Sequence, residues 1–200
     1  MAKLPQLLVE HVKLEKKKSE YSSETLRQAA LEKIETFDDV SHIIYTGGST
    51  SGRQENGGAG MMIQDADGQV VHEASFPAGA KCSSYTGESV AFLEAIRWVH
   101  EKGKERSNIV GKVLICSDSM SLAQSLDKNR WKDMDPWLQR IKDVLFELTS
   151  QVTLLWIPAH CDIEGNERAD ELARRGTEMN QDTTIVRTDQ EQVTHQVTHR

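Results

Sequence analysis

The sequence contains no apolar stretch that approaches the roughly 20 residues of a bilayer-spanning helix, so we expect no membrane-embedded segment. Basic residues are also in the minority, with 24 Lys and Arg against 31 Asp and Glu and a net charge of −7. Because contacts with phosphates supply most non-specific affinity for nucleic acids, this balance argues against strong unaided binding to them. Any contact with a duplex should depend on divalent cations and a local basic loop.

Cysteine is scarce as well, with only Cys82, Cys116 and Cys161 in 200 residues. An odd number at wide spacing offers neither a disulfide framework nor the spacing of metal ligands. This usage favours a reducing compartment, so we expect an intracellular location, cytoplasmic or nuclear. Residues 1–10 are too short and too quickly charged for a signal peptide.

Two hundred residues suffice for about one domain with extensions, and three segments differ in pattern. Residues 1–40 are rich in lysine and are predicted to form a helical extension, with Ser22 or Ser23 as a cap. Residues 41–180 carry the pattern of an α/β domain. Residues 181–200 are polar and without periodicity, so we expect a disordered tail.

The central segment predicts five strands and four helices. The strands are expected at 42–46, 59–64, 69–76, 112–116 and 151–157, and the helices at 84–102, 119–126, 135–149 and 164–178. Three antiparallel strands come first, and the later strands alternate with helices and therefore pair in parallel. The predicted fold is an α/β fold with a mixed five-stranded sheet and helices on both faces.

Three acidic residues stand in distinct local patterns. Glu88 opens an apolar helical run, Asp118 follows a buried-looking strand, and Asp170 lies in the last predicted helix. Taken singly, each has a structural explanation: a first-turn acid favoured by the helix dipole, a helix cap, and an ion pair with Arg174. Carboxylates at the ends of neighbouring strands and at the start of a helix can also converge, and their oxygens are the ligands that Mg²⁺ prefers.

These acids, together with the segment 45–49 (Tyr-Thr-Gly-Gly-Ser), occur in the order and spacing of the ribonuclease H domain family. The chain resembles the form carried by non-LTR retrotransposons, whose first strand reads Tyr-Thr-Asp-Gly-Ser. Gly47 thus stands where the family has an Asp that bridges two metal ions. The resemblance implies a ribonuclease H-like fold over about residues 41–180 and two-metal hydrolysis of the RNA strand of RNA/DNA hybrids. With one ligand missing, we expect weakened binding of Mg²⁺ or Mn²⁺ and impaired catalysis.

The resemblance also assigns roles to residues around the acids. His160, in the loop before the last helix, would assist proton movement and product departure, in a loop where Ala159 and Asp162 replace family glycines. Contacts to the nucleic acid would come from Gly48, Ser49, Ser84, Ser119 and Asn166, with short polar groups reading 2′-hydroxyls, and from Lys128 and Arg130 on phosphates. The serines can equally be turn and cap residues, and the basic segment can equally be an exposed connector.

Two functions stay open from the sequence. One is a ribonuclease H-type endonuclease domain with reduced activity. The other is an inactive scaffold of the same fold that binds nucleic acid or a protein partner. The expected partners are an RNA/DNA hybrid or other nucleic acid and a reverse transcriptase domain, and the chain is expected to be a monomer.

Overall fold

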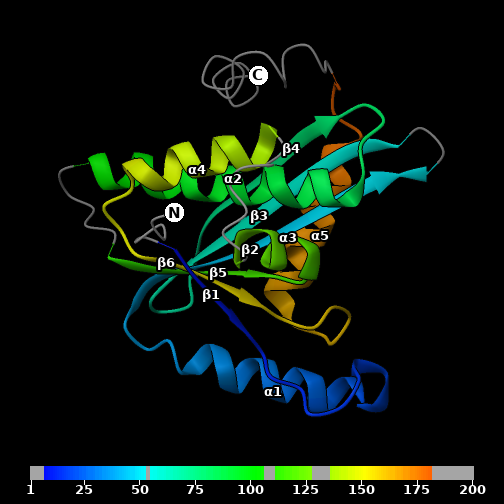
Figure 1. The fold of residues 1–200 in the computed structure, drawn as a ribbon, viewed down its shortest axis with the longest axis vertical. Coiled ribbons are helices and arrows are strands. Elements are labelled where there is room, and N and C mark those ends of the chain that lie inside the picture. Colours follow the sequence, from blue (N-terminus) through cyan, green and yellow to red (C-terminus); the bar gives the residue numbers. More distant parts are fainter. Residues whose placement is uncertain (1–6, 53–54, 106–110, 128–135, 182–200) are drawn as a thin grey trace.

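The computed structural model describes residues 7–52, 55–105, 111–127 and 136–181. The chain contributes six strands to one sheet: β1 (Leu7–His11), β2 (Val40–Ser51), β3 (Asn56–Asp65), β4 (Val70–Gly79), β5 (Lys112–Ser117) and β6 (Val152–Trp156). Its helices are α1 (Ser23–Glu35), α2 (Ser84–Lys104), α3 (Met120–Asp127), α4 (Pro136–Glu147) and α5 (Glu164–Thr177), with a 3₁₀ turn at Lys18–Glu20. Figure 1 shows this arrangement.

The sheet has the strand order β1-β6-β5-β2-β3-β4. Strands β2, β3 and β4 pair antiparallel, and β2, β5 and β6 pair in parallel. This confirms the predicted mixed α/β fold. Strands β5 and β6 are buried except for Lys112, and most of their residues are apolar because helices cover both faces of the sheet.

The sixth strand corrects two expectations, namely a five-stranded sheet and a helical segment 1–40. Residues Leu7–His11 form β1, which pairs in parallel with β6 from Leu7 opposite Val152 to His11 opposite Trp156. Without β1, the outer edge of β6 would expose unpaired backbone groups. These five residues form a strand through their pairing with β6, and their own sequence did not predict it. The helix predicted in this segment is present as α1, with the Ser22 Oγ accepting from the backbone N–H of Thr25 at 3.2 Å.

Strand β2 is longer than the predicted strand 42–46, because the glycine-rich segment that follows continues the ladder with β3. Gly47 lies opposite Gly60, and Gly48 lies opposite Ala59. The basic segment with Lys128 and Arg130 lies outside the described residues. So does the expected tail 181–200, except for Gln181, whose side chain bonds to the backbone of Gly79 and Gly176.

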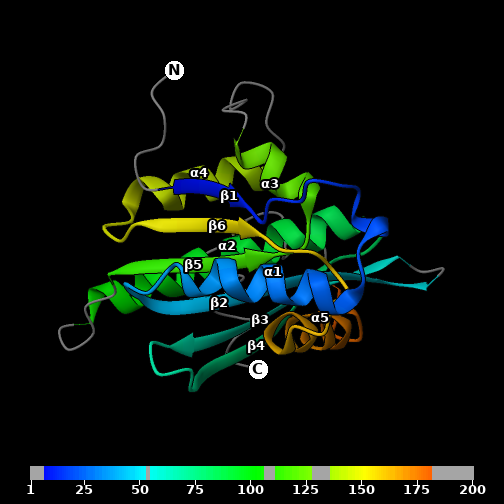
Figure 2. The ribbon, with the colours of Figure 1, turned by 90° about the horizontal axis from the view of Figure 1, so that it is seen from below.

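The helices cover opposite faces of the sheet (Figures 1 and 2). Adjacent residues on a strand point to opposite faces, and the two glycines of β2 show which helix lies on each side. A Cβ on Gly47 would meet Asp170 and Ala169 of α5, whereas one on Gly48 would meet Gly87 and Glu88 of α2. Helix α4 packs with α2, and α1 lies on the side away from both. Within the described ranges, no helix has sufficient length and apolar character to cross a membrane.

Candidate active site

The site begins where two parallel strands run side by side. Tyr45 of β2 pairs with Cys116 of β5, so Gly47 and Asp118 each lie two residues further along their chains. Asp118 directly follows β5, and its backbone carbonyl accepts a hydrogen bond from the Trp156 indole Nε1 at 3.2 Å. Gly47 therefore lies within β2 at the level where β5 ends and Asp118 follows.

Helix α2 brings Glu88 over the part of β2 that lies beside the end of β5. Ser83 caps the helix by accepting from the backbone N–H of Thr86 at 3.3 Å. The helix start packs directly on β2: a Cβ on Gly48 would lie 2.3 Å from the backbone nitrogen of Glu88. Only glycine fits so close an approach of two backbones. This packing carries Glu88 into the interior of the protein.

Glu88 is 6% exposed and held by two donors. The backbone N–H of Gly48 and the Ser117 hydroxyl, the latter at 3.4 Å, donate to its carboxylate. Burial nevertheless raises the pKa of Glu88 well above its usual value, and the negative charges of Asp118 and Asp170 raise it further. The three predicted acids are therefore close enough to repel one another.

Asp170 approaches from α5 on the other face of the sheet. Its Oδ1 lies 2.7 Å from the position that a Cβ on Gly47 would occupy, so this carboxylate lies against the bare backbone of β2. Burial, followed by the charge of Asp118, raises the pKa of Asp170 to about 7, against a lowering by Arg174. Asp170 thus titrates near neutral pH in the absence of a cation.

Asn166 lies one helical turn before Asp170 and joins the site. Its Nδ2 donates to Asp118 Oδ2 at 3.2 Å, and its side chain is 3% exposed. The Oδ1 atom of Asn166 is buried and has no hydrogen-bond partner among the described residues. Asn166 therefore orients the Asp118 carboxylate from within the acidic cluster, and its burial leaves no open surface for the predicted contact with nucleic acid.

The donor set suits a hard divalent cation in its chemistry. Carboxylate oxygens are preferred by Mg²⁺ and Mn²⁺, and a cation would relieve the repulsion that raises the pKa values of Glu88 and Asp170. The arrangement fits less well: in the part of the chain that the structure describes, no three His, Cys, Asp or Glu side chains lie where they could hold one metal ion together. Gly47 offers no side-chain oxygen. As the side chains stand, the described carboxylates therefore do not surround a metal ion.

His160 lies in the loop between β6 and α5 and is exposed to solvent. Its φ of 57° and the φ of 59° at Asp162 are in the left-handed region, which non-glycine residues rarely adopt. Between them, Cys161 is buried and its Sγ donates to the Pro158 carbonyl at 3.2 Å. The loop is thus compact, with the His160 side chain on its outer surface.

The predicted nucleic-acid contacts occupy different surroundings. Ser84, the first residue of α2, is exposed, and Gly48 and Ser49 are partly buried in β2. Ser119 accepts from the backbone N–H of Leu122 at 3.2 Å, which makes it a cap of α3. Ser84 and Ser49 therefore keep the accessible polar groups that the prediction requires.

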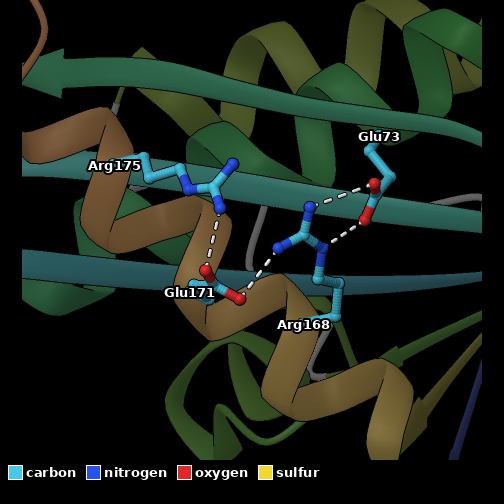
Figure 3. A network of polar contacts seen from close by, with 4 residues as sticks. All are labelled: Glu73, Arg168, Glu171 and Arg175. Carbon is cyan, nitrogen blue, oxygen red and sulfur yellow. Dashed lines mark hydrogen bonds and ion pairs between the residues drawn. The ribbon is translucent and has the colours of Figure 1, made fainter.

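An ion-pair network fastens α5 near Asp170 (Figure 3). The Arg168 guanidinium donates through Nε and Nη2 to Glu73 of β4, and through Nη1 to Glu171 at 2.8 Å. Glu171 also accepts from Arg175 at 2.8 Å. The network connects the helix that carries Asp170 to an edge strand of the sheet, and so limits how far the helix can shift.

Sequence reasoning missed three residues that support the acids: Ser117, Trp156 and Arg168. Ser117 adjoins Asp118, and Arg168 lies two residues before Asp170, so proximity in sequence could have drawn attention to both. Trp156 ends β6 and bonds to the backbone of Asp118. Only the pairing of β5 with β6 reveals that contact.

The amino-acid sequence matches a known protein family and several of its members. Residues 39–178 match the family model described as RNase H. Ribonuclease H of Hyphomonas neptunium is 28% identical over 141 residues, a match that covers 68% of this chain and 91% of that protein.

Two solved structures share the fold. LC11-RNase H1, isolated from compost and solved in complex with an RNA/DNA hybrid, superposes with a TM-score of 0.55 at 24% identity, over 68% of this chain and 96% of that one. The foamy viral protease-reverse transcriptase, also solved with an RNA/DNA hybrid, gives a TM-score of 0.57 at 22% identity, over 70% of this chain and 20% of that one.

Proposed function

Because the chain belongs to the ribonuclease H family, we propose that it is a ribonuclease H-type endonuclease domain that acts on the RNA strand of RNA/DNA hybrids. We further propose that its activity is low, because Gly47 replaces a carboxylate, and that it is of the retrotransposon type that its sequence motifs resemble. The observation that carries the proposal is the convergence of Glu88, Asp118 and Asp170 from α2, β5 and α5 on one end of the sheet, with the pKa of two of them raised.

Glu88, Asp118 and Asp170 are the residues that would hold Mg²⁺ or Mn²⁺, more weakly than a complete set. When bound, such an ion activates a water molecule and neutralises charge on a phosphate. The chain itself fixes the carboxylates. Ser117 and the Gly48 N–H orient Glu88, and Asn166 orients Asp118.

Two groups in the site can hold or exchange protons. Asp170, with a pKa of about 7, carries a proton for part of the time at neutral pH when no cation is bound. His160 is exposed in its loop and can exchange protons between the leaving group and solvent. The exposed position of His160 supports the role that the family resemblance implies for this residue.

Recognition of the hybrid would use the minor groove. Ser49 and Ser84 offer accessible polar groups for 2′-hydroxyls, and Lys128 and Arg130 offer charges for phosphates. The relative LC11-RNase H1 was solved with an RNA/DNA hybrid, which supports a hybrid as the ligand of this chain. The match to part of a foamy viral reverse transcriptase supports a reverse transcriptase domain as a partner. We expect the chain to act as a monomer.

One observation favours the alternative of an inactive scaffold. The Asp170 carboxylate lies where a side chain on residue 47 would project, and the described acids do not jointly surround one ion. A site relaxed in this way could retain a surface for the hybrid without cleaving it.

A cleavage and binding assay separates the two functions. The chain is incubated with a labelled RNA/DNA hybrid and Mg²⁺ or Mn²⁺, beside an Asp118→Asn variant, and binding is measured in parallel. Slow cleavage of the RNA strand that requires metal and disappears with Asp118→Asn supports the enzyme. Binding without cleavage supports the scaffold. If the chain neither binds nor cleaves the hybrid, both proposals are wrong.

A further inference from the structure

The loop that carries His160 is held in an unfavourable backbone conformation. His160 and Asp162 have φ values of 57° and 59°, where a Cβ crowds the backbone. Residues in such conformations persist only when the surrounding structure holds them. Inside the loop, the buried Cys161 bonds to the Pro158 carbonyl and Ile163 is buried as well. The backbone carbonyl of Asp162 accepts a hydrogen bond from a residue outside the loop.

That outside contact comes from the N-terminal extension. Arg27, on α1, donates from Nε to the backbone carbonyl of Asp162 at 3.2 Å. The charge of Arg27, with that of Lys18, also reaches the Cys161 thiol. Both residues precede the segment 39–178 that matches the family model, so the contact is an addition of this chain to the shared fold.

The extension is anchored firmly enough to act on the loop. Leu26 and Ala30 bury the inner face of α1, and Lys33 of α1 forms an ion pair with Glu10 of β1 at 3.0 Å. Strand β1 pairs with β6, the strand that leads into the loop. Figures 1 and 2 both show α1 lying beside the loop between β6 and α5.

A second line of contacts runs from the same extension to Asp118. The Val12 N–H donates to the Trp156 carbonyl at 3.0 Å, and the His11 ring lies 6.5 Å from the Trp156 ring. Trp156 in turn donates its indole N–H to the backbone of Asp118. Two parts of the candidate site therefore connect to residues 7–27.

We propose that the β1–α1 extension clamps the loop between β6 and α5, and that Arg27 is a positioning residue that keeps His160 in place. The clamp itself follows from the contacts, whereas the role of His160 rests on the function proposed above. His160 and Asp162 adopt a left-handed backbone conformation without being glycine. The contact from the extension stabilises the loop in this conformation.

The rate at which Cys161 reacts with a thiol reagent tests the clamp without any nuclease assay. Its side chain is 2% exposed, so it reacts only when the loop opens. Arg27→Ala should raise the Cys161 rate about five- to tenfold, which lies within the range for the loss of one solvent-exposed hydrogen bond. Gln28→Ala, a change of the neighbouring exposed residue on α1, should leave it unchanged.

Peptide mass spectrometry of the labelled protein supplies internal controls. Cys116, buried in β5, reports global unfolding, and Cys82 reports a distant surface. Both rates should be the same in the variants as in the unmodified chain. The proposal is overturned if Arg27→Ala changes the Cys161 rate by less than twofold, or if it raises the Cys116 rate equally.

A rescue experiment separates positioning from general stability. Asp162→Gly removes the side chain that makes the left-handed conformation unfavourable. In a protein that also carries Arg27→Ala, this change should return the Cys161 rate at least halfway to its original value. A double variant no slower than Arg27→Ala alone would refute the link between the clamp and the backbone conformation.

The catalytic part is tested in a Gly47→Asp background. Adding Arg27→Ala should lower kcat several-fold and leave KM within twofold, because His160 acts after the hybrid has bound. An equal change in both constants, or none, would refute the positioning role. If the Gly47→Asp protein does not cleave at all, the proposed function fails, while the Cys161 rates still decide the clamp.

Discussion

Replacing Gly47 by Asp should restore metal-dependent cleavage of the RNA strand of a hybrid. The gain should be on the order of a thousandfold or more, because a two-metal mechanism depends on the carboxylate that bridges the ions. The scaffold around the position is present: Glu88, Asp118 and Asp170 lie close to one another, and Asp170 lies against Gly47 of β2.

The structure also gives the steric cost of this change. The new Cβ would lie 2.7 Å from Asp170 Oδ1, and 3.0 and 3.1 Å from the carbonyl carbon and oxygen of Ala169. The first contact is with the end of a side chain that can rotate away, so Asp170 must leave its present position. The second is with the backbone of α5, which must move by a few tenths of an ångström against the ion pairs of Arg168.

These shifts should lower the free energy of unfolding by about 1–3 kcal/mol in the absence of metal. A fourth carboxylate beside three others adds repulsion to this cost. Bound cation reverses it, since an ion present at 100 times its Kd stabilises the folded state by about 2.7 kcal/mol. The variant should therefore be less stable than the unmodified chain in EDTA and should gain more from Mg²⁺.

Two controls and two measurements complete the test. Gly47→Asn fills the same space without the charge, so it should carry the steric cost but gain neither cleavage nor Mg²⁺-dependent stability. Adding Asp118→Asn to the Gly47→Asp protein should abolish the gain. Hybrid cleavage and urea unfolding, each with and without Mg²⁺, report the outcome. A Gly47→Asp protein that folds, binds metal and does not cleave would refute the reasoning, and the loop at Ala159 and Asp162 would be the first suspect.

Three other predictions follow from the charges of the site. The raised pKa of Asp170 means that the folded state binds its proton more tightly than the unfolded state, so stability in metal-free buffer should fall as pH rises from about 4 to about 7. Urea unfolding should show that Asp170→Asn reduces this fall and that Mg²⁺ opposes it. Calorimetric titration with Mn²⁺ should detect one weakly held ion, and two tight sites would reveal an unrecognised ligand. Hybrid binding should fall tenfold or more between about 50 and 200 mM salt, and insensitivity to salt would exclude Lys128 and Arg130 as phosphate contacts.

The central fold could be predicted from the sequence because each element carries its own pattern. The apolar run from Val113 to Cys116 requires cover on both faces, and the turn after Asp65 defines a hairpin. Strand β1 could not be predicted in this way. Its residues become a strand because β6 has a free edge, and that edge exists only once the sheet has formed.

The acids of the site were recognisable because each stands in a distinct local pattern: Asp118 directly follows a strand, Glu88 lies near the start of a helix, and Asp170 lies within the last helix. Their environments were not. The pKa of Glu88 is raised by burial, then by the charge of Asp118, and the pKa of Asp170 is raised by the same two causes. Such values arise from contacts between elements far apart in the sequence. The contact of Arg27 with Asp162 spans 135 positions, and neither residue carries a local pattern that indicates the other.

The two adjacent glycines of β2 differ in whether the fold leaves room for a side chain. At Gly48, a Cβ would lie 2.3 Å from the Glu88 backbone nitrogen and 2.6 Å from the Gly87 carbonyl carbon, so helix and strand leave no room for any side chain. At Gly47, the shortest contact is with the movable carboxylate of Asp170. Glycine is thus required by packing at one position and only accommodated at the next. Because the strand, both helices and the three acids keep their arrangement around Gly47, the fold of this chain does not depend on a carboxylate at position 47.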